Sequence, residues 1–237
     1  YLTSIYQQTT LSKSWQGNLY NDLLQRYKRM RANINIHNMD CMDAMKEMED
    51  NQFNLAIVDP PYGIGFAKTH SGKGWIVRES KDWDKETPKS SYFDELFRIS
   101  ENQIIWGGNY FVKHLFHSQG WIFWDKGQRK FSLADGELAF SSYDRALRVF
   151  TYTRGHMQAA DKNKKHPTQK PVALYKWLLE NYAKEGDNLL DTHLGSGSIA
   201  IACWDLKFNL TGYELDEEYY NDAMNRFNTH CTQGQLF

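Results

Sequence analysis

The sequence predicts an α/β fold, in which short apolar strands alternate with helices along the chain. Two stretches carry this prediction. Residues 34–58 show an alternating strand, an acidic residue at its end, a short helix and a second apolar strand. Residues 188–214 show a strand, a Gly-x-Gly turn, a helix, a further strand and a terminal carboxylate. This succession is typical of a parallel sheet covered by helices.

Length and composition allow one large globular domain. Of the 237 residues, 41% are hydrophobic and 15% are aromatic, which is enough for a sizeable core. No apolar run approaches the roughly 20 residues of a membrane-spanning helix, so we expect no membrane association. The cysteines Cys41, Cys203 and Cys231 lack metal-ligand spacing. We therefore expect reduced thiols in a cytoplasmic protein, and no zinc or other metal site.

We divide the chain into an N-terminal tail and helix, residues 1–33, and a single domain at residues 34–237. The domain contains a loop of about residues 63–91, rich in Gly, Lys, Ser and Thr, whose length predicts a mobile, functional segment. Four further strands are predicted, at residues 103–106, 121–124, 138–140 and 147–152. We expect the last two of these strands to pair with each other antiparallel.

Charge is distributed unevenly, although the net charge is only −1. Residues 126–170 hold ten Lys and Arg against four Asp and Glu, whereas residues 171–237 hold four against ten. A basic middle beside an acidic end is typical of a protein that binds a polyanion on one face. A solvated surface with uneven charge is the alternative. The residues that we expect to contact phosphates are Lys126, Arg129, Lys130, Arg154, Lys162, Lys164 and Lys165.

The stretch Asp59-Pro60-Pro61-Tyr62 ends the second apolar strand and is the first candidate for chemistry. Its two prolines fix the backbone and remove two N–H donors, so the carbonyls of Asp59 and Pro60 are left as acceptors beside a carboxylate. An exocyclic amine is a poor nucleophile until acceptors bind its hydrogens and draw out its lone pair. Tyr62 offers a flat face on which a flipped-out base can stack. A rigid turn after a strand is the alternative interpretation.

The second candidate is the nucleotide-binding strand–turn–helix–strand unit near the C-terminus. Gly195 and Gly197 permit a tight turn, and Glu214 follows Gly195 by nineteen residues, near the spacing of a carboxylate that binds ribose hydroxyls. Gly195-x-Gly197-x-x-Ala200 also fits the dinucleotide fingerprint, which makes an NAD enzyme a competing hypothesis. Only forty residues follow Gly197, however, too few for a second mononucleotide-binding half. Asp191, before the turn, favours a cationic amino group, which S-adenosylmethionine carries.

With these motifs in this order, the chain resembles the DNA amino-methyltransferases, in the group whose catalytic motif precedes the cofactor glycine loop. The resemblance covers most of residues 34–228 and implies a doubly wound, mostly parallel, seven-stranded sheet in circularly permuted order, with S-adenosylmethionine as cofactor. It assigns catalysis to Asp59, Pro60, Pro61 and Tyr62. It assigns the cofactor pocket to Asp40, Cys41, His166, Thr168, Lys170, Asp191, His193, Gly195, Ser196, Gly197, Ser198 and Glu214.

Two features depart from the pattern of that family. His193 stands where the glycine loop of the family usually has Phe, which leaves the packing role of that position open. The target-recognition region would fall between Thr153 and Lys165, where only thirteen residues remain. A segment this small argues against recognition of a long sequence, and the 63–91 loop is expected to share the task.

The resemblance implies methyl transfer to the exocyclic amino group of adenine in DNA, by base flipping and in-line attack, in a bacterial or phage-infected cell. Asp59 favours adenine, because the family tends to carry Ser before Pro-Pro for cytosine. Cytosine N4, adenine in RNA and protein amide nitrogen are alternative targets. A nucleic-acid-binding partner subunit is the non-enzyme alternative, although such a subunit would be expected to have lost the acidic residue or the aromatic. Association as a homodimer or with a partner subunit is left open.

Overall fold

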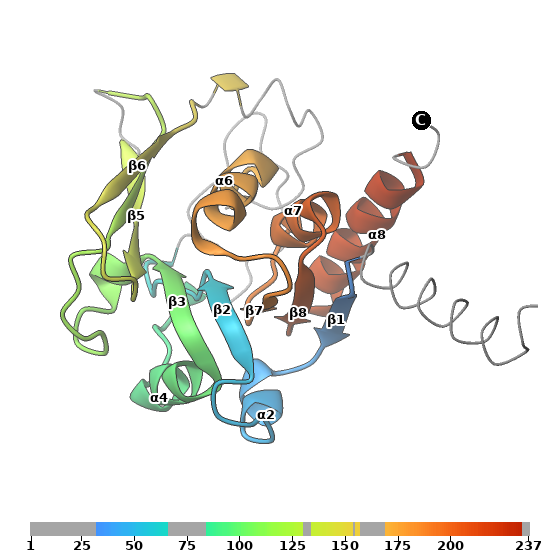
Figure 1. The fold of residues 1–237 in the computed structure, drawn as a ribbon, viewed down its shortest axis with the longest axis horizontal. Helices are drawn as coiled ribbons and strands as arrows, with labels where there is room; N and C mark the ends of the chain where they lie inside the picture. The colour runs from blue at the N-terminus through green and yellow to red at the C-terminus, as the bar shows by residue number, and fades with distance from the viewer. Residues whose placement is uncertain (1–31, 66–83, 130–133, 154, 157–168, 234–237) are drawn as a thin grey trace, which may run out of the picture.

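The computed structural model describes residues 32–65, 84–129, 134–153, 155–156 and 169–233, which fold around one sheet (Figure 1). Its strands are β1 (Ile34–Asn38), β2 (Phe53–Val58), β3 (Ser100–Trp106), β4 (Ile122–Asp125), β5 (Gly136–Ser141), β6 (Arg148–Thr151), β7 (Asn188–Asp191) and β8 (Asn209–Glu214). Its helical segments are α2 (Cys41–Met45), α4 (Ser90–Ile99), the 3-10 turn η2 (Gly108–Tyr110), α6 (Val172–Tyr182), α7 (Ser198–Leu206) and α8 (Glu217–Gln233). The predicted N-terminal helix, most of the 63–91 loop and most of the 153–165 segment lie outside the described residues.

The sheet is mostly parallel, as predicted, with the strand order β1-β8-β7-β2-β3-β5-β4-β6. Neighbours from β1 to β3 are all parallel, and β4 pairs parallel with β6. Among the described strands, β5 alone runs the opposite way, antiparallel to both β3 and β4. The amino end of β5 therefore lies at the edge where the other strands have their carboxyl ends, so that Gly136 faces Asp125.

Two details of the predicted sheet are wrong, although the fold class is confirmed. The described sheet has eight strands rather than seven. The strands expected to pair antiparallel, β5 and β6, are separated by β4. Ile122 and Trp124 of β4 are 0% and 1% exposed, as suits a central strand, whereas β6 is an edge strand with mostly exposed residues. Apolar periodicity identifies strands but not their neighbours, which is why the sequence misses this order.

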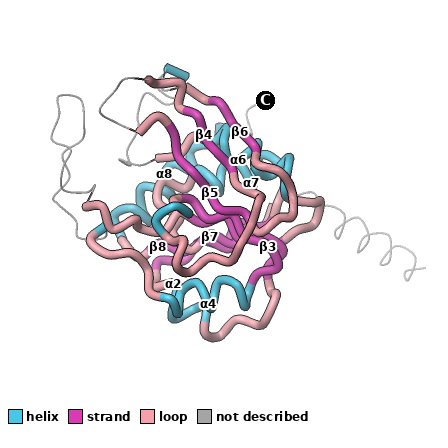
Figure 2. Tube along the Cα trace, turned by 90° about the vertical axis from the view of Figure 1, so that its left-hand side faces the viewer, coloured by secondary structure: helices cyan, strands magenta, loops and turns pink. Residues whose placement is uncertain are grey.

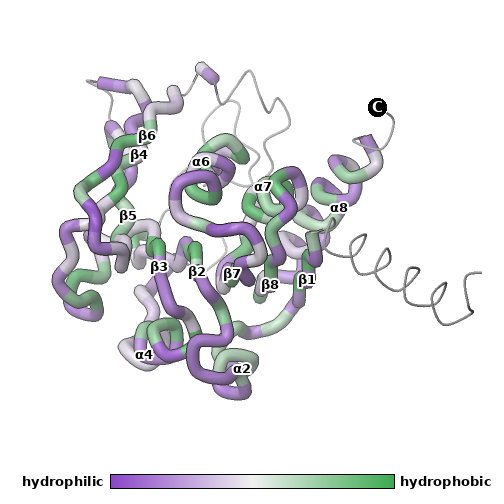
Figure 3. Tube along the Cα trace, in the orientation of Figure 1, coloured by the Kyte–Doolittle hydropathy of each residue, from purple (hydrophilic) through white to green (hydrophobic). Residues whose placement is uncertain are grey.

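Helices cover both faces of the sheet, so the fold is doubly wound (Figures 1 and 2). The helices α6, α7 and α8 bury their apolar side chains against one face, which includes Ile57 and Ile104. The helices α2 and α4 cover the other face, which includes Val58 and Ile105, because successive strand residues point to opposite sides. Each fully buried side chain of this kind contributes roughly 1.5–3 kcal/mol. Helix α7 is hydrophobic over most of its length (Figure 3).

A row of asparagines joins the amino ends of four neighbouring strands, at the edge of the sheet opposite the carboxyl ends. The backbone N–H of Asn33 donates to Asn209 Oδ1 at 3.0 Å, and Asn209 Nδ2 donates to Asn188 Oδ1 at 3.2 Å. The backbone N–H of Asn188 donates in turn to Asn54 Oδ1 at 3.0 Å. Each side chain thus binds a group on the next strand, which fixes the register of β1, β8, β7 and β2 where their ladders begin.

We expect Asn209→Ala to lower the free energy of unfolding by about 1 kcal/mol, because it removes two hydrogen bonds of this row. Urea denaturation monitored by circular dichroism measures the change. The matched control is Asn228→Ala on α8, which removes an exposed asparagine side chain. Equal stability of the two variants would show that the row does not contribute to stability.

Candidate functional site

Acidic residues gather at the carboxyl edge of the sheet, where the parallel strands end. Asp40 follows β1, Glu214 ends β8, Asp191 ends β7 and Asp59 follows β2. These four strands are neighbours in the sheet, so residues from distant parts of the sequence come to one edge. Ligands of open α/β sheets bind in the crevice at this edge. The arrangement brings the two predicted motifs, the Asp59 turn and the glycine loop, to the same side of the molecule.

The Asp59–Tyr62 turn is held by a buried carboxylate that sequence reasoning missed. Asp84 is 3% exposed, and its Oδ1 accepts the backbone N–H groups of Tyr62 and Gly63, both at 2.9 Å. The Tyr62 hydroxyl donates to Asp59 Oδ1 at 2.6 Å. These bonds fix the tyrosine ring relative to the carboxylate. No sequence pattern singles out Asp84, because it lies within a long polar loop.

The segment after β3 packs its aromatic side chains and a glycine against the ring of Tyr62. Tyr110, which is 47% exposed, stacks on it with a centroid distance of 5.0 Å and an interplanar angle of 12°. Phe111 meets it edge-on at 6.1 Å. Gly107 has φ +69°, and a Cβ at that position would lie 2.2 Å from Tyr62 Cε1. Only a glycine lets the backbone run this close to the ring.

Four charges alternate beside this turn. The Lys170 ammonium donates to Asp59 Oδ2 and lies 3.2 Å from Glu137 Oε2, while Lys126 Nζ donates to Glu137 Oε1 at 2.6 Å. Burial by itself lowers the pKa of Lys170, but the Asp59 and Glu137 charges outweigh it and raise that pKa above its ordinary value. Burial alone would raise the pKa of Glu137, yet the two lysines hold it at about 2. Lys170 and Glu137 are therefore both charged at neutral pH.

The glycine loop between β7 and α7 is fixed by carboxylates on both sides. Asp191 is 1% exposed and accepts the backbone N–H of His193 at 3.0 Å. Glu214 accepts the backbone N–H of Gly195 at 2.8 Å through Oε2 and that of Asp216 at 3.0 Å through Oε1. Burial is the main cause that raises the pKa of Asp191 to about 8, and burial also raises the pKa of Glu214.

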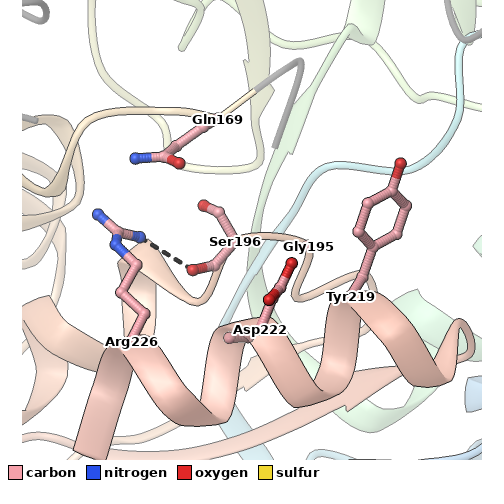
Figure 4. A pocket seen from close by; sticks show the side chains of 7 residues that line it. Gln169, Gly195, Ser196, Tyr219, Asp222 and Arg226 are labelled. Atoms are coloured by element: carbon pink, nitrogen blue, oxygen red, sulfur yellow. Dashed lines mark hydrogen bonds between the residues drawn. The ribbon is translucent and has the colours of Figure 1, made fainter. Parts of the chain in front are cut away.

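Helix α8 braces the same loop from outside (Figure 4). Arg226 Nη1 donates to Ser196 O and to Ser198 Oγ, each at 2.9 Å. Gly197, with φ +70°, lies against Ala223 of the helix, whose Cβ would be 3.2 Å from a Cβ at position 197. A small pocket opens here between the loop and the helix. It is lined by Gln169, Gly195, Ser196, Tyr219, Asp222, Ala223 and Arg226.

His193 of the glycine loop packs as an aromatic ring against α4. Its ring meets Tyr92 edge-on, with a centroid distance of 5.4 Å and an angle of 73°. Its Nδ1 lies 2.9 Å from Thr192 Oγ1, which lies 2.6 Å from the Tyr92 hydroxyl. Burial lowers the pKa of His193 to about 4, so the ring is neutral at physiological pH. A neutral aromatic ring therefore occupies the position, with an added hydrogen bond to its neighbour.

The residues after β1 lie at the same carboxyl edge of the sheet, beside the end of β8. Asp40 is the N-cap of α2, and its Oδ1 accepts the backbone N–H of Met42 at 2.8 Å. The Cys41 thiol is buried, which raises its pKa to about 12 and keeps it neutral. Asn38 Nδ2 donates to the carbonyl oxygen of Glu214 at 2.8 Å, tying β1 to β8. The predicted Asp40–Cys41 pair thus lies beside the loop that Glu214 holds.

Other predicted residues fall elsewhere or outside the described residues. Lys126 Nζ donates a hydrogen bond to Glu137 and lies 4.9 Å from the centroid of the Trp124 ring. Arg129 is 55% exposed and pairs with Asp125. The remaining predicted residues that lie outside the described ranges are Lys130, Arg154, Lys162, Lys164, Lys165, His166 and Thr168. Within the described ranges, no cluster of His, Cys, Asp and Glu could hold a metal ion, and none of the helices has the length and hydropathy of a transmembrane segment.

Sequence comparisons match the chain to a family model and to type II methyltransferases. A family model described as DNA methylase matches residues 105–225. The type II methyltransferase M.HpaI of Haemophilus parainfluenzae is 24% identical over 228 residues, covering 80% of this chain and 73% of that protein. The type II methyltransferase M1.MboII of Moraxella bovis is 24% identical over 257 residues, covering 79% of this chain and 94% of that protein.

Solved structures of similar fold include a complex of M1.HpyAVI with SAM, at a TM-score of 0.57 and 20% identity. The match covers 81% of this chain and 99% of that one. The cytosine-N4-specific PvuII DNA methyltransferase matches with a TM-score of 0.55 at 13% identity, over 84% of this chain and 87% of that one. These likenesses confirm the predicted fold class.

We expect Gly107→Ala to be more destabilising than Gly65→Ala, although both glycines have positive φ, +69° and +65°. An alanine at such a φ costs about 1–2 kcal/mol. At Gly65 no atom lies within 4 Å of the new Cβ, whereas at Gly107 the Cβ meets the Tyr62 ring and adds roughly 1–3 kcal/mol of overpacking. Urea denaturation compares the two variants. Equal losses would mean that Tyr62 moves aside without strain.

Proposed function

The chain belongs to the DNA methylase family, and from this membership we propose that it transfers a methyl group from S-adenosylmethionine to the exocyclic amino group of adenine in DNA. The observation that carries the proposal is the proximity of the Asp59 turn to the glycine loop. The strands β2 and β7 are parallel neighbours in which Ala56 faces Leu190, so Asp59 and Asp191 lie at the same carboxyl edge. Burial raises the pKa of Asp191, and the charge of Asp59 acts in the same direction. An amine at Asp59 and a cationic cofactor at Asp191 would thus meet at one edge of the sheet.

The residues of the glycine loop fit S-adenosylmethionine. The donor carries an ammonium group, for which the buried Asp191 offers a carboxylate in a setting of low dielectric. Each oxygen of Glu214 accepts one backbone N–H, and a carboxylate oxygen retains a second lone pair for a ribose hydroxyl. The neutral Cys41 thiol suits an uncharged ring. The M1.HpyAVI structure of similar fold was determined with SAM, which supports the same assignment here.

The donor supplies an electrophilic methyl group on a sulfonium. The chain supplies position and acceptors: the Asp59 carboxylate and the Pro60 carbonyl accept the hydrogens of the target amine and direct its lone pair toward the methyl group. Tyr62 provides the stacking face for the flipped base. This stacking partly offsets the free-energy cost of unstacking the base from the duplex. Holding the two reactants in line supplies much of the rate. Asp59 acts as an acceptor and need not remove the proton before attack, because the amine becomes acidic once it is methylated.

Adenine rather than cytosine is the proposed target because position 59 is Asp, where the family tends to carry Ser for cytosine. The cytosine-N4 specificity of the PvuII enzyme belongs to a chain of similar fold, so the fold is compatible with both. The test is transfer of a radiolabelled methyl group to DNA, followed by digestion to nucleosides and chromatography. We expect label in N6-methyl-2′-deoxyadenosine; label in N4-methyl-2′-deoxycytidine would support the second target instead.

We expect Asp59→Ala to reduce the rate of methyl transfer at least about a hundredfold, because a positioned group in direct contact with the amine is removed. Binding of the donor, measured by calorimetry, should be kept or become tighter, because loss of the Asp59 charge lowers the pKa of Asp191. The control is Asp94→Ala, which removes an exposed carboxylate on α4 and should leave both quantities unchanged. A rate within a few-fold of wild type would exclude Asp59 from catalysis.

Donor binding should strengthen as the pH rises from 6 to 7. The pKa of Asp191 is raised to about 8, so its carboxyl group is protonated below that pH, and only the ionised form attracts the donor's ammonium. Each pH unit in this window raises the ionised fraction, and hence the affinity, about tenfold, while an α-amino group stays mostly protonated. His193, with a pKa of about 4, is neutral throughout.

Calorimetric titrations at the two pH values measure this effect. Asp191→Asn, which has no titrating proton at that position, should bind the donor weakly and with little dependence on pH. A wild-type affinity that is the same at pH 6 and pH 7 would place the ammonium elsewhere.

A further inference from the structure

Lys170 stands in the segment that the resemblance assigns to the cofactor pocket, yet its described polar partners lie on the catalytic side. Its side chain is only 2% exposed. The ammonium binds Asp59, lies 3.4 Å from the Tyr62 hydroxyl and is 3.2 Å from Glu137. It also lies over the Trp106 ring at 5.3 Å. Lys170 therefore packs against the Asp59–Tyr62 turn and binds both of its end residues.

The antiparallel direction of β5 brings a second carboxylate, that of Glu137, to the Lys170 ammonium. Glu137 is the second residue of β5, and it faces Trp124 of β4 at the carboxyl edge of the sheet. If β5 ran parallel to its neighbours, its first residues would lie at the opposite edge, far from Asp59. The Glu137 side chain is 22% exposed, and its charge is matched by Lys170 on one side and Lys126 on the other.

The two oxygens of Asp59 have different partners, which gives them different roles. Oδ2 is bound by Lys170, whose ammonium is enclosed and cannot move without leaving a buried charge unpaired. Oδ1 is bound by the Tyr62 hydroxyl, a neutral partner that a target amine can replace. Lys170 thus fixes the carboxylate plane and leaves Oδ1 as the exchangeable acceptor.

We propose that Lys170 and Glu137 are positioning residues for methyl transfer: Lys170 orients the Asp59 carboxylate through Oδ2, and Glu137 holds the Lys170 ammonium in place. This inference rests on the proposed function, because it concerns the same reacting amine. It differs from the assignment of Lys170 to the cofactor pocket, since the lysine acts here on the acceptor of the amine and not on the donor. Neither residue touches the reacting atoms.

The test measures kcat for transfer to DNA and the dissociation constant of the donor separately, in Lys170→Met and Glu137→Gln. For Lys170→Met we expect kcat to fall at least about a hundredfold, as a misplaced reacting group does, with a donor affinity within about threefold of wild type. Glu137→Gln keeps the size and shape of the side chain, so it should fold even where Lys170→Met does not. For it we expect a fall in kcat of about tenfold, with unchanged donor affinity.

The matched control is Lys176→Met, which removes a partly exposed lysine on α6 that pairs with Asp205. It should leave kcat and donor affinity as in wild type. A weakened donor with unchanged kcat in Lys170→Met, or a wild-type kcat in Glu137→Gln, would overturn the inference while leaving the proposed function standing. Absence of methyl transfer by the wild-type protein would overturn the proposed function, and this inference with it.

Discussion

A lysine ammonium remains charged inside a protein only where carboxylates surround it, because removal from water disfavours the charged form by several kcal/mol. Lys170 meets this constraint through Asp59 and Glu137, and Glu137 is matched in turn by Lys126. The four side chains come from the ends of β2, β4 and β5 and from the residue before the N-cap of α6. Both β2 and β5 must therefore reach this edge before the buried Lys170 ammonium has its two carboxylates.

The topology of the sheet brings the charged residues of the site to one edge. Parallel strands deliver Asp40, Glu214, Asp191 and Asp59 at their carboxyl ends, and the reversed β5 delivers Glu137 at its amino end. The two carboxylates of the proposed cofactor site, Asp191 and Glu214, belong to neighbouring strands and flank the glycine loop. The two parts of the site thus differ in their electrostatics. At the glycine loop, burial raises the pKa values of Asp191 and Glu214. At the Asp59–Tyr62 turn, lysines pair with the carboxylates, and the pKa of Glu137 is lowered.

Much of this site was predictable from the sequence because each motif is local. A strand followed by Asp59-Pro60-Pro61-Tyr62, and a strand followed by Gly195-x-Gly197, carry their own geometry within a few residues. The α/β class followed from the alternation of strands and helices. Asp84, Tyr110 and Glu137 were missed for a physical reason: each reaches the catalytic turn from a separate part of the chain, through contacts that no local pattern encodes. Lys170 was assigned to the cofactor pocket by the resemblance, while its partners were visible only in the structure.

We propose that Lys170 acts on the target amine through Asp59, and that Asp191 binds the cofactor. A crystal structure of the protein with S-adenosylhomocysteine tests this division most directly, because the product has both an ammonium and a carboxylate. The account predicts that the ammonium of the product lies within hydrogen-bonding distance of Asp191, and that Lys170 Nζ stays on Asp59 and Glu137. A Lys170 side chain turned away from Asp59 to bind the carboxylate of the product would contradict it.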